Sequence, residues 1–429
     1  MGVTIPAVEA TDTWTIDWRC KSFPPSAEGM PAADVPSAGW RLPSDFTTPV
    51  AALTESALAH NLALMQQYCG NHGVRIAPHG KTTMSPELIA RQLEHGAWAM
   101  TAATPWQARA MLGFGARRVI IANECLDPVG LRWVAESMRA DPDVEIFVFA
   151  DSVAAVESMR QVLSECSSGR PVPVLVEMGV PGGRAGARDT AVAVEVGRAV
   201  AAAPELELAG VAGFEGVIGS RRVPDVVAPV REFLGTIREA AEQLMSAEAF
   251  PAHRPAILSA GGSAFFDQVV EVFTADRHRY PRPVEVVIRS GCYITHDHGA
   301  YREVSPFAGD AAHDFRPALH VWSRVLSTPE PGLAIVDAGK RDISTDGRMP
   351  VPLSRMRGDS LAALSGVVVD HFNDQHGFLH TAAAPEGELQ VGDLVIMGVS
   401  HPCTTFDKWR AIPVVDDDHR VVSAIRTYF

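Results

Sequence analysis

The sequence describes a large, acidic chain with the composition of a globular protein. Its 429 residues are 47% hydrophobic and 21% charged, which is enough for a large core and two domains. The net charge of −14 argues against a nucleic-acid partner, since phosphate backbones are bound by basic surfaces. No membrane span is visible, and residues 1–17 lack the apolar core of a signal peptide. Because the six cysteines show no CxxC spacing, we expect a reduced compartment, by default the cytoplasm.

Short apolar runs alternate with helical patterns up to about residue 290. After a helix over residues 55–69, strand candidates begin near Val74, Ala97, Arg118, Val144, Val172, Leu206, Ala256 and Val284. Helices are expected over residues 105–112, 152–163, 190–202, 226–245 and 263–273. Strands and helices alternating in this way predict an α/β fold, a (β/α)8 barrel. A doubly wound open sheet is the alternative, because periodicity does not show closure.

From about residue 306 the pattern changes to β-like runs joined by turns. These runs cover residues 318–326, 333–337, 366–370, 388–397 and 421–429. We therefore predict three parts. Residues 1–47 form an N-terminal extension that packs with the β domain, residues 48–305 form the barrel, and residues 306–429 form the mainly-β domain.

The first strand candidate leads into the most informative motif of the chain, Pro78-His79-Gly80-Lys81-Thr82-Thr83-Met84. Lys81 lies between an apolar run and a helix start, with Ser85 as the N-cap and Pro86 at the first helical position. Ligands gather at such strand-to-helix junctions in parallel α/β folds, and a lysine there can form a Schiff base. The alternative is a solvated surface lysine. A P-loop is excluded, because Arg75 stands where that motif needs glycine.

Glycine-rich segments follow three of the later strand candidates. Ser259-Ala260-Gly261-Gly262-Ser263 follows the seventh strand and opens a helix, and Ser290-Gly291-Cys292-Tyr293 follows the eighth. Their N–H groups could bind a phosphate. The segment from Gly179 to Gly186 follows the fifth strand and contains Arg184, whose fixed positive charge suits a cofactor ring. Each segment is also compatible with an ordinary turn or surface loop.

His401-Pro402-Cys403 is the candidate metal site. Pro402 favours an extended conformation for His401, and residues i and i+2 of an extended segment face the same side. Imidazole and thiolate together suit Zn²⁺, and two ligands with open positions would form a catalytic site. A partly buried His and Cys without a metal is the alternative. His296-Asp297-His298 is a competing i, i+2 pair, although it could simply line the mouth of the barrel.

Together these residues resemble the D-serine dehydratase and D-threonine aldolase family, whose fold is similar to the alanine racemase type (fold type III) of pyridoxal-phosphate enzyme. The resemblance covers about residues 45–428. The matching segments are Pro78-His79-Gly80-Lys81-Thr82, Gly183-Arg184-Ala185-Gly186, Ala260-Gly261-Gly262-Ser263, Gly291-Cys292-Tyr293, Asp337-Ala338-Gly339 and His401-Pro402-Cys403-Thr404. The chain departs from the family at Ala77, where arginine is common, and in its N-terminal extension.

The resemblance implies a cofactor, a metal and their binding residues. Lys81 would carry pyridoxal 5'-phosphate as an internal aldimine, and Arg184 would contact the pyridine nitrogen. His401 and Cys403 would hold a divalent metal, preferably zinc. The other residues expected around the cofactor are His79, Ser259, Gly261, Gly262, Ser263, Gly291 and Tyr293. The family also implies a homodimer.

The implied reaction is dehydration of a D-3-hydroxyamino acid, such as D-serine, to a 2-oxo acid and ammonia. Lys81 would remove the Cα proton, and the metal would act as a Lewis acid on the hydroxyl. An aldolase would use the same groups to release glycine and an aldehyde. Cys403 favours the dehydratase, because the related aldolases tend to carry a carboxylate there. A racemase would not need the metal pair, and a non-catalytic pyridoxal-phosphate carrier would resemble the barrel alone.

Overall fold

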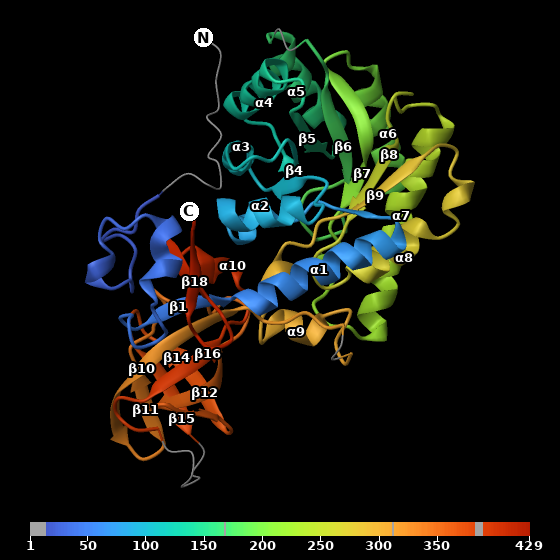
Figure 1. Ribbon diagram of the computed structural model, residues 1–429. Coiled ribbons are helices and arrows are strands. Elements are labelled where there is room, and N and C mark those ends of the chain that lie inside the picture. Colours follow the sequence, from blue (N-terminus) through green and yellow to red (C-terminus); the bar gives the residue numbers. More distant parts are fainter. Residues whose placement is uncertain (1–13, 167–168, 311–312, 382–388) are drawn as a thin grey trace. The chain divides into compact units, whose positions relative to one another are not determined.

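The computed structural model describes residues 14–166, 169–310, 313–381 and 389–429, which form two compact units (Figure 1). The described residues of the first unit are 65–81, 89–166 and 169–291, and those of the second are 14–64, 82–88, 292–310, 313–381 and 389–429. No helix in the described part of the chain combines the length and the apolar character that crossing a membrane requires.

The first unit is built on a parallel sheet with the strand order β2-β9-β8-β7-β6-β5-β4-β3. Its strands are β2 (Arg75–Ile76), β3 (Met100–Ala102), β4 (Arg118–Glu124), β5 (Glu145–Ala150), β6 (Val172–Met178), β7 (Leu206–Gly213), β8 (Ala256–Ala260) and β9 (Val284–Ile288). All eight lie where the sequence predicts strands.

The two ends of this sheet meet just after β2. His79 forms a parallel bridge with Thr101, whose N–H donates to the carbonyl of Pro78 at 2.8 Å. The N–H of Trp98 donates to the carbonyl of Ile76, also at 2.8 Å. These bonds close the sheet, so the prediction of a (β/α)8 barrel is confirmed and the open-sheet alternative is excluded.

Helices alternate with the barrel strands and flank them (Figure 1). They are α1 (Glu55–His72), α2 (Pro86–Glu94), α3 (Pro105–Gly113), α4 (Pro128–Ala140), α5 (Val153–Ser164), α6 (Thr190–Ala202), α7 (Pro224–Ser246) and α8 (Phe266–Thr274). Four starts are set by side-chain caps, because Thr104, Asp127, Ser152 and Asp189 each accept the N–H three residues later. Short 3₁₀ turns follow several strands, including η3 (Gly80–Thr82) and η4 (Glu215–Val217).

The second unit is built on a mainly antiparallel sheet, which confirms the mainly-β domain predicted for the C-terminal part of the chain. Its strands are β1 (Val50–Thr54), β10 (Leu319–Glu330), β11 (Leu333–Val336), β12 (Val351–Arg357), β13 (Ser360–Ala363), β14 (Val367–Phe372), β15 (Gly377–Thr381), β16 (Leu394–Gly398), β17 (Ala411–Val415) and β18 (Val421–Arg426). Two short helices, α9 (Ala300–Val304) and α10 (Cys403–Phe406), and the 3₁₀ turns η1 (Pro25–Ala27), η2 (Ala32–Ala38) and η6 (Cys292–Ile294) belong to the same unit, whereas η5 (Arg277–Arg279) lies in the first.

The N-terminal residues from 14 to 46 pack into the core of the second unit. Phe23, Trp40 and Phe46 contact one another edge to face and belong to one cluster with Trp322 and Val421. Such aromatic contacts add to the free energy of burying the rings. The following strand, β1, pairs with β10 and β17. It therefore belongs to the antiparallel sheet, although the predicted boundary at residue 48 assigns it to the barrel.

Candidate functional site

The carboxyl ends of eight parallel strands lie at one rim of the barrel, and the predicted cofactor residues follow these ends. Lys81 follows β2 and its side chain is exposed. Arg184 follows β6, Gly261 and Gly262 follow β8, and Gly291 follows β9. The first unit therefore brings these residues to the same rim, and the exposed Lys81 amine is accessible to a carbonyl compound.

His79 lies in the seam that closes the barrel, two residues before Lys81. The ring is partly buried, and its Nδ1 has no hydrogen-bond partner in the described part of the chain. Desolvation and the positive charges of Lys81, Arg289 and Arg184 hold the pKa of His79 well below its usual range. The imidazole is therefore neutral at physiological pH.

The predicted phosphate turn holds an anion of the protein itself. The N–H groups of Gly261 and Gly262 donate to the two carboxylate oxygens of Glu215, at 2.9 and 2.8 Å. Glu215 is fully buried at the start of η4. Gly261 adopts a φ of +104°, and a Cβ at Gly262 would lie 2.8 Å from the ring of Phe214, so both positions favour glycine. A phosphate bound by these two N–H groups would have to replace the carboxylate.

Arg289 directly follows β9 and is 4% exposed. Its Nη1 donates to the Ser259 hydroxyl at 2.6 Å and its Nη2 to the carbonyl of Gly213 at 2.7 Å. The Ser259 hydroxyl in turn donates to the carbonyl of Val287 at 2.9 Å. The Nε of Arg289 is buried without a partner among the described residues. Burial lowers the pKa of Arg289 to about 10, so the guanidinium remains charged at neutral pH.

Arg184 extends over the ring of Phe214, with its Cζ 4.6 Å from the ring centroid. The loop that carries it requires two glycines at the point where its ends approach. A Cβ at Gly186, whose φ is +110°, would lie 2.4 Å from the backbone nitrogen of Gly179. The N–H of Gly186 also donates to the Asp151 carboxylate at 3.0 Å. The predicted arginine loop is thus anchored to the barrel.

These features fit a phosphorylated, polar cofactor. The rim presents an exposed amine at Lys81 and a glycine turn with two N–H groups, which a phosphate could use only in place of the Glu215 carboxylate. Buried polar atoms of His79 and Arg289 lack partners in the described residues. One local prediction is wrong, because α8 begins at Phe266 and not at Ser263, so the glycine turn does not open the helix directly. Tyr293 lies in the second unit, buried in η6.

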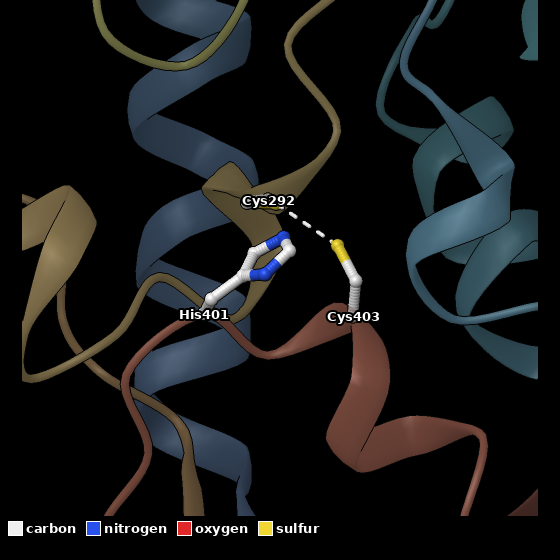
Figure 2. A group of neighbouring side chains, drawn as sticks. All are labelled: Cys292, His401 and Cys403. Atoms are coloured by element: carbon white, nitrogen blue, oxygen red, sulfur yellow. Dashed lines mark hydrogen bonds between the residues drawn. The ribbon is translucent and has the colours of Figure 1, made fainter. Parts of the chain in front are cut away.

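The predicted metal residues His401 and Cys403 lie close together in the second unit, and Cys292 joins them (Figure 2). One ligand atom from each of the three residues lies within 4.8 Å of the other two. The two sulfur atoms are 3.5 Å apart. The donor set of one imidazole and two thiols suits zinc.

The backbone brings His401 and Cys403 together by a different route from the predicted extended segment. His401 has a φ of +72°, in the left-handed region, Pro402 is helical, and Cys403 begins α10. The expected strand-like i, i+2 arrangement is therefore wrong, because a tight turn into a short helix replaces it. The N–H of His401 donates to the buried Asp297 carboxylate at 2.8 Å, which holds this turn in place.

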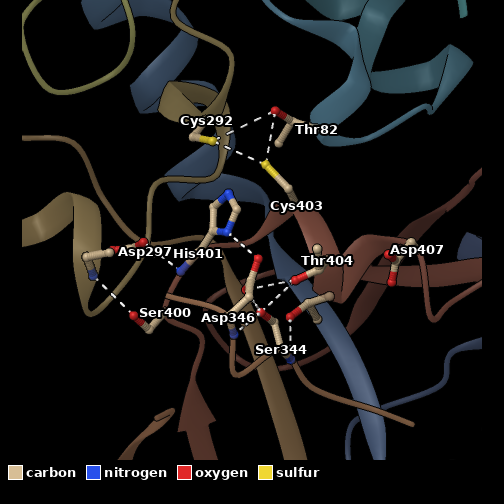
Figure 3. Close-up of polar contacts among 12 residues, drawn as sticks. Thr82, Cys292, Asp297, Ser344, Asp346, Ser400, His401, Cys403, Thr404 and Asp407 are labelled. Carbon is tan, nitrogen blue, oxygen red and sulfur yellow. Dashed lines mark hydrogen bonds and ion pairs between the residues drawn. The ribbon is translucent and has the colours of Figure 1, made fainter. Parts of the chain in front are cut away.

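A polar network surrounds the His401 ring (Figure 3). Nδ1 of His401 lies 2.8 Å from Oδ2 of Asp346. Asp346 is hydrogen-bonded in turn by the hydroxyls of Thr404, at 2.8 Å, and Ser344. Because an ionised carboxylate only accepts hydrogen bonds, His401 donates through Nδ1 and turns Nε2 toward other groups.

The competing histidines do not join the cluster. His296 is buried and His298 is half-buried, and desolvation lowers the pKa of His296 to about 4 and that of His298 to about 2. Among the described residues, only Cys292, His401 and Cys403 form a group of three potential ligands. Within the competing segment His296-Asp297-His298, Asp297 contacts the cluster, because its carboxylate accepts a hydrogen bond from the N–H of His401.

The sequence motifs missed several residues that the structure places at these sites. They are Glu215, Arg289, Cys292 and Asp346. Cys292 is part of the segment predicted to bind phosphate, and 111 residues separate it from Cys403. The one available signal was a cysteine in the loop that follows the eighth barrel strand.

The sequence is similar to a known family model and to several characterised enzymes. Residues 318–415 match the model of a putative serine dehydratase domain. The chain is 26% identical to a D-threonine aldolase of Arthrobacter sp over 92% of its length and 93% of the relative. It is 26% identical to a D-threo-3-hydroxyaspartate dehydratase of Delftia sp. strain HT23, covering 87% of this chain and 95% of the relative.

Solved structures show the same architecture. The D-threonine aldolase of Filomicrobium marinum superposes with a TM-score of 0.75 at 25% identity, covering 91% of this chain and 97% of that one. The alanine racemase of Clostridium difficile 630 shares the fold, with a TM-score of 0.60 at 12% identity over 89% of this chain and 99% of that one.

The chain is thus similar over most of its length to the D-serine dehydratase-like and D-threonine aldolase family of alanine racemase-like, fold type III pyridoxal-phosphate enzymes. The resemblance inferred from the sequence motifs is thereby confirmed. The family comprises D-threonine aldolases, 3-hydroxy-D-aspartate aldolases and D-threo-3-hydroxyaspartate dehydratases, and it uses pyridoxal phosphate and a metal ion.

Proposed function

We propose that this protein is a pyridoxal-phosphate- and metal-dependent enzyme that dehydrates and deaminates a D-3-hydroxyamino acid, such as D-serine, to a 2-oxo acid and ammonia. The observation that supports this most is the link between Lys81 and the thiol cluster. Lys81 is covalently joined to Thr82, whose Oγ1 lies 3.5 Å from Sγ of Cys403 and 3.8 Å from Sγ of Cys292. The Cα atoms of Lys81 and Thr82 are about 3.8 Å apart, because the two residues are consecutive. The residue next to Lys81 therefore contacts the candidate metal ligands.

Lys81 would bind the cofactor covalently, and Arg184 would face the pyridine nitrogen. Bound pyridoxal phosphate supplies an electron sink for negative charge at the substrate Cα. A guanidinium does not readily give up its proton, so Arg184 would leave this sink comparatively weak. Early departure of the β-hydroxyl would therefore be valuable. The other residues proposed around the cofactor are His79, Ser259, Gly261, Gly262, Ser263, Gly291 and Tyr293.

His401 and Cys403 would hold a divalent metal, and their nitrogen and sulfur donors suit zinc. When bound, the metal supplies Lewis acidity for the departure of the β-hydroxyl. The Lys81 amine, released when the substrate takes its place, would accept the proton from Cα. Lys81 would thus act at the substrate Cα, and the metal held by His401 and Cys403 would act on the hydroxyl at Cβ.

Retro-aldol cleavage to glycine and an aldehyde is the second candidate. It is favoured by the similarity to the Arthrobacter D-threonine aldolase over 92% of this chain. The thiol of Cys403 supports the dehydratase instead, because a thiolate ligand favours zinc and Lewis-acid departure of a hydroxyl. The two reactions release different products from the same substrate.

Product analysis tests the proposal directly. The protein, supplied with pyridoxal phosphate and Zn²⁺, is incubated with D-serine, D-threonine and D-threo-3-hydroxyaspartate, and products are identified by mass spectrometry and an ammonia assay. We expect a 2-oxo acid and ammonia in equal amounts. Glycine with an aldehyde would establish the aldolase, and an unchanged substrate in all three reactions would contradict both.

Replacement of Lys81 tests the cofactor assignment. We expect Lys81→Ala to lose the visible absorbance band of the protein-bound cofactor, because no amine remains at this position to form the covalent bond. Lys340→Ala is the control, since Lys340 is exposed in the second unit. A Lys81→Ala variant that keeps the band would refute the assignment.

A further inference from the structure

We propose that Cys292 is a third protein ligand of the metal, which gives a Cys₂His site with one open position, and that Asp346 is a positioning residue for His401. This inference rests on the proposed metal at His401 and Cys403. It adds a thiol that the sequence motif of the metal site does not contain.

The separation of the two sulfur atoms supports a shared ion. Tetrahedral zinc with Zn–S bonds of about 2.3 Å places two thiolate sulfurs about 3.8 Å apart. Sγ of Cys292 and Sγ of Cys403 are 3.5 Å apart, close to this value and far from a disulfide bond of about 2.05 Å. The imidazole nitrogen of His401 completes the group within 4.8 Å (Figure 2).

Burial favours the same role for Cys292. The residue is 5% exposed and its neighbours include the Thr82 hydroxyl at 3.8 Å. Burial shields this thiol from oxidants and large reagents, but a small cation can still reach it. A zinc ion bound by three protein atoms would keep one open coordination position. In the proposed reaction that position would receive the substrate hydroxyl.

Asp346 is placed to fix the orientation of His401. Its carboxylate accepts from Nδ1 at 2.8 Å and is itself held by the hydroxyls of Thr404 and Ser344 (Figure 3). A carboxylate behind a histidine fixes the tautomer that leaves Nε2 free for a metal. The set of two thiols and one imidazole selects a soft cation such as zinc over Mg²⁺ or Mn²⁺.

Metal binding to the full-length, metal-free protein tests the inference. Zn²⁺ affinity is measured by competition with a chromogenic chelator in the wild type, Cys292→Ser, Cys403→Ser and Asp346→Ala. We expect each cysteine variant to lose more than about 100-fold in affinity, and Asp346→Ala to lose about 10- to 100-fold. Cys125→Ser, which removes a buried cysteine of the first unit, should bind as the wild type does.

Cobalt substitution of the wild type provides a readout that needs no variant. The intensity of thiolate-to-Co²⁺ charge transfer in the near ultraviolet reports the number of thiolate ligands, and we expect two. Cys292→Ser should reduce the intensity by half while circular dichroism remains unchanged. One thiolate in the wild type, or wild-type Zn²⁺ affinity in Cys292→Ser, would overturn the role of Cys292 and leave the proposed function standing.

The outcomes separate the inference from the proposed function. If the wild type and Cys403→Ser bind Zn²⁺ equally weakly, the metal site of the proposed function itself fails. If Asp346→Ala binds as the wild type does, the positioning role of Asp346 is wrong. A disulfide between Cys292 and Cys403 in the active protein, detected by mass after alkylation, would also contradict the inference, because disulfide sulfurs cannot both act as thiolate ligands.

Discussion

His401, in the candidate metal cluster, is held in an uncommon backbone conformation. Its φ of +72° lies in the left-handed region, which costs an L-residue about 1–2 kcal/mol and is adopted mainly by glycine and, less often, by asparagine and aspartate. Asp297 offsets this by accepting the His401 N–H, and the same carboxylate accepts the N–H groups of Gly299, Tyr301 and Arg302. The histidine is thereby fixed at its backbone by Asp297 and at its ring by Asp346.

Glu177 provides a residue-scale prediction about pH. Burial and the neighbouring Glu124 carboxyl raise the pKa of Glu177 to about 8, from about 4.5 for an ordinary glutamate. Between these pH values the folded protein holds a proton that the unfolded chain has released. The stabilising contribution of Glu177 is therefore complete below about pH 4.5 and is lost as the pH rises through about 8.

Glu177→Gln should remove this dependence, because an amide stays neutral. In the cofactor-free protein, we expect the free energy of unfolding of Glu177→Gln to rise relative to the wild type as the pH increases from about 5 to about 9. Urea unfolding at several pH values measures this difference. Glu136→Gln, on the exposed face of α4, serves as the control. Parallel pH profiles of Glu177→Gln and the wild type would contradict the prediction.

At the scale of elements, close packing between barrel strands depends on glycine. Gly210 in β7 pairs with Ile257 in β8, and a Cβ at position 210 would lie 2.2 Å from the Ile257 carbonyl oxygen and 2.7 Å from Leu175. A backbone atom cannot move aside as the end of a side chain can. The spacing of these two strands therefore leaves no room for a larger residue.

Gly210→Ala should destabilise the protein by about 2–3 kcal/mol, because overpacking forces the strands apart. Gly235→Ala is the matched control. Gly235 lies in α7 with no atom near the added Cβ, and alanine there should stabilise the helix by about 0.5–1 kcal/mol. Chemical denaturation compares the two variants. Equal stabilities would show that the crowding at β7 is relieved by small backbone shifts.

At the scale of the whole molecule, two hydrophobic clusters of the described residues lie in different units. One lies inside the barrel and includes Phe147, Phe149 and Leu175. The other lies in the second unit and joins the N-terminal Phe23 to strand residues such as Trp322. Multi-domain chains often unfold in more than one step, so each core has its own stability.

Truncation of one ring in each core should act locally. We expect Phe23→Ala and Phe147→Ala each to cost about 3–5 kcal/mol, the usual loss for a buried phenylalanine. Hydrogen exchange followed by mass spectrometry should show faster exchange in β1, β10 and β18 for Phe23→Ala, and in β4, β5 and β6 for Phe147→Ala. Faster exchange over the entire chain in both variants would indicate a single cooperative unit instead.

Local signals explain why much of the fold is predictable. The barrel strands are short apolar runs, and helix starts carry caps such as Thr104 and Ser152, so periodicity and capping identify them. Five strands of the second unit, β1, β12, β13, β15 and β17, escape prediction. β12 is mostly half-buried and contains serine and arginine, and β13 is mostly exposed, which weakens the apolar signal of a strand.

Sequence patterns predict the alternation of strands and helices, the lysine after the first barrel strand and the resemblance to the family, because each of these signals consists of short segments of the chain. The tertiary structure is needed to establish the closure of the barrel through His79 and Thr101 and the position of β1 in the antiparallel sheet. It also decided the meeting of Cys292 with Cys403 and the occupation of the glycine turn by Glu215. These contacts join residues distant in the chain, and their geometry depends on packing that periodicity and motif spacing do not encode.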